Sequence, residues 1–397
     1  MVEYRPFPED RRATFSAMLS YAFSPELGPF APADEDETPP QARVGENRGL
    51  FDGDHPVSVC RHHFFDTRVR GTTLSMGGIS AVATPPEHRR KGYIRRLLTE
   101  TLGEYRDRDV PVASLWPFET SFYAQFGWAT AFRTAVQTAD PAVYRIGDPP
   151  AGRYYRAEKD DWDALDAVLD SHAHEYELAV DRSESWWRNR AFHGWETDPY
   201  VYVWEHDGRP SGYVVYAITE EDDEKTLDVW DMAFRDTDAH HALLGFLANH
   251  DSQVETVRLP TPPREMLLDL VADPEELDVS LKTGAMVRIV DVEMAFEAIT
   301  YPEDVDGQVV LSVTDPLVDW NDGTFALDIA DGVASVSTVD RPADVDVDIG
   351  SLSQLFVGYR DLETMATENT MTVEDHFRAA VLDNSLPASS VYLREGF

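Results

Sequence analysis

The sequence predicts a protein of the α/β type, in its α+β form, with three consecutive units in which helices pack on mixed β-sheets. Its 397 residues are more than a single ordinary hydrophobic core organises. Strand-like runs alternate with segments of helical spacing along the whole chain. The order of elements in the middle of the chain also loosely repeats the order at its start, which is typical of a duplicated fold.

The first unit is expected over residues 1–147. Residues 10–23 have the spacing of an amphipathic helix, and turn signals separate the strand-like runs that follow. Residues 93–106 place their apolar side chains on one side, as in a helix that packs on a sheet. The other elements expected here are an acidic loop at 31–43, strands at 49–51, 57–65, 74–83 and 110–116, a short helix at 122–126 and a linker at 146–152.

The second unit is expected over residues 148–286 and the third over residues 287–397. The second unit opens with a helix within 157–178, and the third ends at the last residue of the chain. The other elements expected in the second unit are strands at 200–206, 211–218, 226–234 and 257–259, and a helix at 237–250. Those expected in the third unit are strands at 309–315, 323–330, 332–338 and 345–350, and helices at 351–360 and 374–383.

The chain is strongly acidic, with 73 Asp and Glu residues against 34 Lys and Arg residues and a formal net charge of -39. An acid-rich surface with few lysines is typical of halophilic proteins, because molar salt screens the repulsion between like charges within a few ångströms. A polycationic partner is the alternative, but the acidity is spread along the entire chain. The composition argues against a nucleic-acid partner, since phosphate binding requires a broad basic face.

The sequence also predicts a cytoplasmic location and no membrane association. The N-terminal MVEYRPFPEDRR has no apolar run, and no stretch approaches the roughly 20 apolar residues of a membrane span. The single cysteine, Cys60, excludes an internal disulfide framework and a cysteine metal cluster. The pairs His62–His63 and His240–His241 lack metal-ligand spacing and are interpreted as surface or half-buried residues. No metal is expected.

Positive charge gathers at one place, the segment EHRRKGYIRRLL (87–98). A predicted strand leads through this loop into a helix, so the N–H groups of residues 90–95 lie where a helix has unpaired donors. The helix dipole and Gly92, which has no β-carbon, favour the approach of a phosphate. A solvated basic helix start is the alternative, but cations there oppose the dipole unless an anion binds.

The strand–RRKGYI–helix arrangement resembles the acyl-coenzyme-A pyrophosphate loop of the GCN5-related N-acetyltransferases (GNAT), Q/R-x-x-G-x-G/A, through Arg89, Gly92 and Ile94. The isoleucine departs from that pattern and is similar to the bulky aliphatic residue of the enhanced-intracellular-survival (Eis) family. ISAVAT before the loop, SLWPFETSFYAQFGW (114–128), RSESWWRNR (182–190) and the terminal phenylalanine are similar to that family as well. The resemblance covers essentially the whole chain.

The resemblance implies two tandem GNAT-like domains with mixed sheets and a C-terminal sterol-carrier-protein-like domain. It implies an acetyl-CoA-dependent N-acetyltransferase that moves the acetyl group directly to an amine of a cationic small molecule or a lysine-like substrate, and a homo-oligomer, a hexamer in the family. In the family fold, pantetheine inserts where two central strands splay apart. The cofactor contacts implied for this sequence are Val82, Ala83, Thr84, Arg89, Arg90, Lys91, Gly92, Tyr93, Ile94, Arg95, Phe118 and Glu119.

Two catalytic groups follow from the same resemblance. Tyr123, in FYAQFGW, matches the family's general acid, and a phenol with an ordinary pKa of about 10 suits a thiolate leaving group. The strand GGISAVAT has no glutamate to serve as the base. The family uses the α-carboxylate of a terminal aromatic residue, which implies Phe397 here. Chain termini are usually frayed and inert, so this role depends wholly on the resemblance.

The second unit lacks a matching phosphate loop, because RDTDAHHALLGF follows its TLDVWDMAF strand, and one cofactor site is therefore expected. Two alternatives to an enzyme stay open. One is a non-catalytic binding protein whose sterol-carrier-like domain holds an apolar ligand. The other is an assembly scaffold that keeps the fold only for packing. Neither requires the basic RRKGYI loop.

Overall fold

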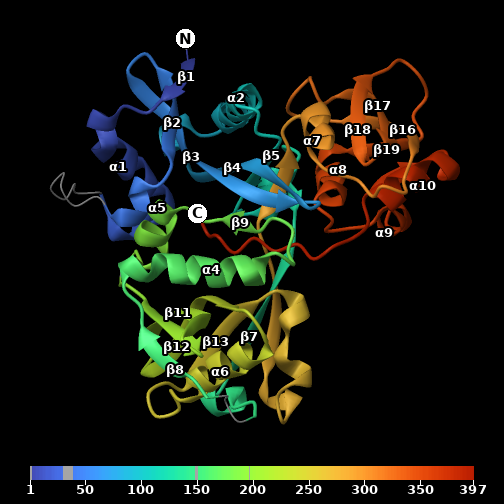
Figure 1. Cartoon of the computed structure of the whole chain (residues 1–397). Coiled ribbons are helices and arrows are strands. Elements are labelled where there is room, and N and C mark those ends of the chain that lie inside the picture. The colour runs from blue at the N-terminus through green and yellow to red at the C-terminus, as the bar shows by residue number, and fades with distance from the viewer. Residues whose placement is uncertain (1, 30–38, 148–150, 196) are drawn as a thin grey trace.

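The computed structural model of the chain describes residues 2–29, 39–147, 151–195 and 197–397. Figure 1 shows three units around a common centre, with the C-terminus lying at that centre, between the first unit and the helix α4 of the second. Most of the acidic loop expected at 31–43 and the middle of the linker expected at 146–152 fall outside the described residues.

The first unit is a mixed sheet with helices packed on it. The strand order is β1-β2-β3-β4-β5-β15-β6, and β9 pairs with β3 at one side. Only β4 and β5 among these neighbours run parallel. The strands are β1 (Val2–Pro6), β2 (Glu46–Asp52), β3 (His55–Val69), β4 (Thr72–Ala83), β5 (Val112–Leu115), β6 (Ala129–Thr130), β9 (Val180–Asp181) and β15 (Met286–Ile289). The helices are α1 (Arg12–Phe23), α2 (Tyr93–Asp107) and α3 (Thr120–Ala124).

The second unit repeats this plan. Its strand order is β14-β7-β13-β12-β11-β10-β8, with β12 and β13 parallel and α4 and α6 packed on the sheet. The strands are β7 (Arg133–Ala139), β8 (Arg153–Arg156), β10 (Tyr200–His206), β11 (Arg209–Glu221), β12 (Glu224–Phe234), β13 (Thr256–Thr261) and β14 (Asp278–Thr283). The helices are α4 (Trp162–Ala173), α5 (Glu184–Trp186) and α6 (Thr237–Ala248), and a π-helical turn, η8 (Trp187–Ala191), continues α5.

The third unit has a sheet of order β18-β17-β16-β19-β20. One cluster of buried side chains joins its core to the first sheet, from Phe65 and Met76 to Leu311 and Phe356. The strands are β16 (Gly307–Thr314), β17 (Gly323–Ala330), β18 (Val333–Thr338), β19 (Val345–Asp348) and β20 (Met371–Val373). The helices are α7 (Val292–Ala298), α8 (Ile349–Phe356), α9 (Leu362–Thr367) and α10 (His376–Ser385).

The first two units exchange strands across the boundaries expected from the sequence. β7 lies before residue 147 yet belongs to the second sheet, and β15 spans the expected 286/287 boundary yet lies inside the first sheet, between β5 and β6. All four residues of β15 are buried, so this short strand is a central one with both faces covered. The sheets are therefore not continuous stretches of the chain.

The helix α2 is fixed to the first sheet by a half-buried carboxylate near its C-terminal end. Glu104 accepts hydrogen bonds from Arg48 (Nη2–Oε1 2.6 Å) and from the hydroxyl of Tyr4 (2.7 Å). Burial alone would raise the pKa of Glu104, but these partners outweigh it and lower the pKa from 4.5 to about 2. The ionised carboxylate is thus part of the folded structure at neutral pH.

We expect Glu104→Gln to lower the free energy of unfolding at pH 7 by about 1–3 kcal/mol, because Arg48 and Arg108 each lose a charged partner and Arg48 keeps only Glu46. A folded-state pKa below 4.5 means that the wild-type contribution is complete above pH 4.5 and is lost as pH falls toward about 2. Urea unfolding at several pH values measures this, and the difference between variant and wild type should shrink over that interval. The exposed Glu87→Gln is the matched control, and an equal effect there would contradict the assignment.

Candidate active site

The strands β4 and β5 separate at their carboxyl ends. Their parallel pairing runs from Met76–Val112 to Ile79–Leu115, where β5 stops, and β4 continues to Ala83. Ala81 has a φ of 53°, and the register with β3 is interrupted at the same place. Because β5 stops at Leu115, the last part of β4, which includes the expected cofactor contacts Val82 and Ala83, has no strand partner on the β5 side.

The loop from β4 to α2 presents an uncapped helix N-terminus. Gly92 is the N-cap residue, with a φ of 79° and no side chain that caps the helix. A β-carbon built at Gly92 would meet no atom within 4 Å, so the space in front of the helix is open. Arg90 also has a positive φ, 58°, which is uncommon for a residue with a side chain. The first N–H groups of α2 are therefore free to bind an anion.

The charges of this loop are largely uncompensated. Arg90 and Lys91 are exposed and form no ion pair with any residue that the structure describes. Arg89 donates to the carbonyl of Thr84 (3.0 Å), and Arg95 donates to the carbonyl of Pro316 in the third unit (2.7 Å). Neither contact neutralises charge, so a positive patch remains in a protein of net charge -39.

The equivalent loop of the second unit has the opposite chemistry. α6 begins after β12, as α2 begins after β4, but its N-cap is Asp236, whose carboxylate accepts from the N–H of Ala239 (2.8 Å). Asp238 adds a second negative charge in the first turn. A carboxylate already occupies the place that a phosphate would take, and negative charge repels one. This geometry supports a single cofactor site in the first unit.

Tyr123 lies on α3, just beyond the end of β5. Its side chain is buried, and its ring contacts the rings of Phe118 and Phe122. Burial, followed by repulsion from Cys60, raises the pKa of Tyr123 to about 12. The hydroxyl forms no hydrogen bond with any described residue and stays protonated at neutral pH. It is therefore a free donor close to where β4 and β5 separate.

The chain ends on β4. The ring of Phe397 lies 5.1 Å from the ring of Phe65 and 5.4 Å from that of His63. A β-carbon at Gly78 would come within 2.9 Å of the Phe397 ring, so this glycine provides the space for the terminal residue. Gly77 does the same for the ring of Tyr105 on the other face of the strand. The two glycines of GGISAVAT are thus explained by packing.

The other expected cofactor contacts are arranged as follows. Phe118 is 74% exposed, and the carboxylate of Glu119 caps α3 by accepting from the N–H of Ser121 (3.2 Å). Tyr93 and Ile94 are half-buried in the first turn of α2. Thr84 follows β4 and hydrogen bonds through its hydroxyl to Ser58 (2.9 Å). All these residues lie on loops or helix starts at the carboxyl ends of β4 and β5.

One histidine interpretation is wrong. His62 and His63 are buried, with exposures of 0% and 2%, because β3 is a central strand covered on both faces. They do face opposite ways, as the strand geometry predicts: His62 contacts Thr101 on α2, and His63 contacts Phe397. His63 also lies 2.9 Å (Nε2–Oγ) from Ser80. No signal in the sequence indicated that His63 borders the candidate site. The other pair, His240–His241, is half-buried as expected.

Comparison with known proteins identifies the family. Residues 3–131 and 178–289 each match an acetyltransferase (GNAT) domain, and residues 292–394 match a sterol carrier protein domain. The N-acetyltransferase Eis of Mycobacterium tuberculosis is 27% identical over 397 residues, which covers 96% of this chain and 95% of that protein. The chain belongs to the Eis-like GCN5-related N-acetyltransferases.

Other relatives agree with this assignment. An uncharacterized N-acetyltransferase of Streptomyces griseus is 29% identical over 339 residues, 80% of each chain. The crystal structure of a GCN5-related N-acetyltransferase from Anabaena variabilis has the same fold over 100% of both chains, with a TM-score of 0.85 and 21% identity. This Eis-like protein is thus an acetyl-CoA-dependent N-acetyltransferase with two GNAT domains and a sterol-carrier-like domain, as the sequence predicted.

Two further observations bear on this Eis-like acetyltransferase. Within the described ranges, no helix is both long and apolar enough to cross a membrane. Among the same residues, no group of three or more His, Cys, Asp or Glu side chains is placed to hold a metal ion.

Proposed function

We propose that this Eis-like protein transfers the acetyl group of acetyl-CoA, bound to its first unit, directly to an amine of a cationic small molecule or a lysine-like substrate. The observation that carries this proposal is the position of Phe397. The last residue of the chain packs on β4, the strand whose end opens toward β5 and leads into the basic loop. We infer that the terminal carboxylate, the basic loop and Tyr123 serve one site, near the point where β4 and β5 separate.

The first unit would hold the cofactor through backbone and charge. The backbone at the unpaired end of β4, at Val82, Ala83 and Thr84, would hydrogen bond to pantetheine as it would to a neighbouring strand. The pyrophosphate would lie on the free N–H groups of α2, surrounded by the cations of the segment 89–95. Holding the thioester beside the amine in this way supplies much of the rate, without a covalent intermediate.

Two proton transfers complete the reaction. The α-carboxylate of Phe397 would take a proton from the attacking amine as the carbon–nitrogen bond forms. The carbon–sulfur bond then breaks, and Tyr123 would donate to the departing thiolate. The carboxylate keeps the amine proton until solvent removes it, and the phenol regains a proton from solvent. Since the pKa of Tyr123 is about 12, the phenol is the protonated partner throughout the neutral range.

The net charge of -39 supports a cationic acceptor, because the field of an acidic protein concentrates cations near its surface. The same composition supports adaptation to high salt. We infer a cytoplasmic location from the composition, and a hexamer from the family resemblance alone.

The function is tested by measuring coenzyme A release with acetyl-CoA and a panel of polyamines, lysine derivatives and aminoglycosides in high salt, with products identified by mass. We expect turnover with polycationic amines and little with neutral or anionic amines of the same size. Acetyl-CoA binding without turnover on any amine, together with an apolar ligand that co-purifies, would contradict the proposal and favour the binding protein.

A further inference from the structure

The last twelve residues form a tail, residues 386–397, that leaves α10 in the third unit and passes between the other two units (Figure 1). Two backbone hydrogen bonds join the tail to Glu177. The N–H of Glu177 donates to the carbonyl of Ser390, and the N–H of Tyr392 donates to the carbonyl of Glu177. The tail then continues to β4, where Phe397 ends the chain.

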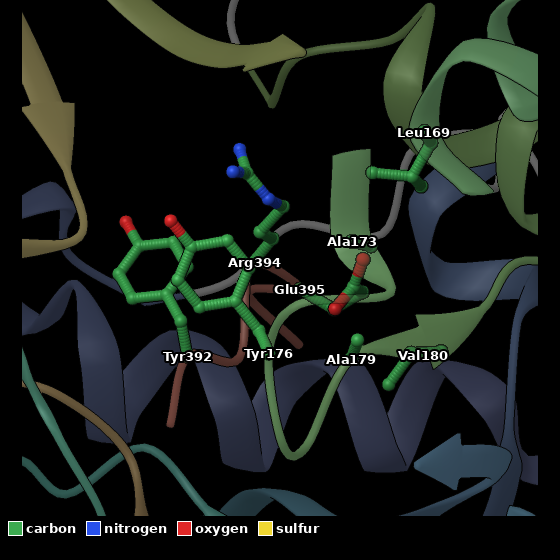
Figure 2. A pocket seen from close by; sticks show the side chains of 8 residues that line it. All are labelled: Leu169, Ala173, Tyr176, Ala179, Val180, Tyr392, Arg394 and Glu395. Carbon is green, nitrogen blue, oxygen red and sulfur yellow. The ribbon is translucent and has the colours of Figure 1, made fainter. Parts of the chain in front are cut away.

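Adjacent residues of the tail contact different groups. Figure 2 shows the side chains of Arg394 and Glu395 pointing away from each other, as expected for an extended segment. The pocket beside them, bordered also by Tyr176 and Tyr392, has a volume of only about 10 Å³. The tail is therefore closely packed at Tyr392, Arg394 and Glu395.

Arg394 binds to the second unit through β12. Its Nη1 donates to the carbonyl of Met232 (2.8 Å) and lies 3.4 Å from Oδ1 of Asp231, and its Nη2 lies 2.5 Å from Nε2 of His172. His172 in turn uses Nδ1 to donate to the carbonyl of Phe234 (3.1 Å). That bond requires a proton on Nδ1, which leaves Nε2 to accept from Arg394.

Arg182, from the segment RSESWWRNR, connects β12 to Glu395, the tail residue after Arg394. Its Nε donates to Oε1 of Glu395 (2.6 Å) and its Nη1 to Oδ2 of Asp231 (2.7 Å). The guanidinium lies 4.6 Å from the centre of the Trp187 ring. The side chains of Arg182 and Glu395 are 5% and 2% exposed. Two arginines face two carboxylates here, so the buried charges compensate one another.

The part of β12 that these residues bind is the counterpart of the cofactor-binding part of β4. Pairing between β12 and β13 ends at Asp228–Arg258, and β12 continues alone on that side to Phe234. The carbonyls of Met232 and Phe234 lie in this continuation. In the first unit the corresponding stretch, from Ser80 to Ala83, is where pantetheine would pair. In the second unit, Arg394 of the tail already binds the carbonyl of Met232, and His172 of α4 already binds the carbonyl of Phe234.

We propose that the second unit, which has no phosphate loop, positions the catalytic end of the chain: its former cofactor groove holds the tail, and Arg182, Asp231 and Arg394 are positioning residues for the carboxylate of Phe397. This inference rests on the proposed role of that carboxylate. Phe397 is the second residue after Glu395, so fixing Glu395 restricts the reach of the carboxylate to about 7 Å. It also gives the unit without a phosphate loop a role in the reaction.

Two further contacts complete the attachment nearer the end. The indole of Trp116, at the end of β5, donates to the carbonyl of Glu395 (2.8 Å). Arg190 donates to the carbonyl of Gly396 (2.7 Å) and lies 4.8 Å from the centre of the Trp186 ring. The tail is thus bound from both the first and the second unit immediately before Phe397.

The test compares Arg182→Met and Arg182→Lys with Arg70→Met in the full chain. Arg70 binds the carbonyls of Leu355, Phe356 and Pro387, so its loss disturbs the start of the tail and leaves the contacts at Arg394 and Glu395 intact. For each variant we would measure kcat, the Kd for acetyl-CoA and the rate at which carboxypeptidase A releases free phenylalanine from the chain end. Thermal unfolding verifies that each variant is folded.

We expect Arg182→Met to release phenylalanine at least tenfold faster than wild type and to lower kcat about tenfold to a hundredfold, with the Kd for acetyl-CoA changed less than twofold. Arg182→Lys should be intermediate, since one ammonium replaces a two-pronged contact, and Arg70→Met should behave like wild type. Unchanged phenylalanine release in Arg182→Met would overturn the proposal, whatever kcat does. Faster release with unchanged kcat would support the anchoring and instead refute the base role of Phe397.

Discussion

Adding one glycine after Phe397 is expected to lower kcat by about two to four orders of magnitude. The extension leaves the phenylalanine ring free to pack on Gly78 but converts its α-carboxylate into a neutral peptide carbonyl. The new carboxylate lies one residue farther along, about 3.5 Å away, which is outside hydrogen-bond reach of the same amine. The measurement is steady-state coenzyme A release with a saturating amine.

The matched control is Phe397→Leu, which keeps the terminal carboxylate and an apolar side chain. It should lose less than tenfold in kcat, because the ring contacts with His63 and Phe65 become weaker but the base remains. The Kd for acetyl-CoA should be the same in both variants, since the phosphate loop is untouched. Full activity in the glycine-extended chain would exclude the terminal carboxylate as the base.

Tyr123→Phe is expected to lower kcat about a hundredfold or more, with little change in the KM for acetyl-CoA. The change removes a hydroxyl that has no hydrogen-bond partner among the described residues and keeps the ring contacts with Phe118 and Phe122. Stability should be nearly unchanged for that reason. Because the pKa of Tyr123 is raised to about 12, the wild-type rate should show no loss from phenol ionisation up to about pH 10.

Tyr21→Phe serves as the control for Tyr123→Phe. Tyr21 is 51% exposed, its ring lies beside Arg89 of the basic loop, and it has no role in the proposed proton transfers. It should retain wild-type kcat. A wild-type kcat in Tyr123→Phe, or an equal loss in both variants, would contradict the role of Tyr123 as the acid. A fall in wild-type rate with an apparent pKa near 10 would contradict the buried environment of its hydroxyl.

The basic loop and its helix could be predicted because their signals are local. Arg89, Gly92 and the apolar stripe of 93–106 lie within one short stretch, and the structure has a helix over Tyr93–Asp107 with Gly92 in the left-handed conformation. The long strands were predictable for the same reason, since alternation over several residues identifies them. Both helices expected at the start of the first two units exist as α1 and α4.

The remaining features depend on contacts between distant residues. β15 is four residues long and has no alternation, because it is buried on both faces between β5 and β6. The contact of Arg182 with Glu395 joins positions 213 residues apart. His63 borders the candidate site only because the chain end folds back onto β4. Sequence spacing carries no information about such pairs, although the charges and tryptophans of RSESWWRNR were a signal that this segment does more than cover the surface.

Whether the first unit alone binds the cofactor is tested by calorimetric titration of acetyl-CoA into the full chain and into an Arg90→Gln/Lys91→Gln variant. We expect one binding site per chain and at least a tenfold loss of affinity in the variant, because the free cations and the open helix start belong to the first unit. The opposite chemistry at Asp236 predicts that no second site exists. Two sites per chain, or unchanged affinity in the variant, would contradict it.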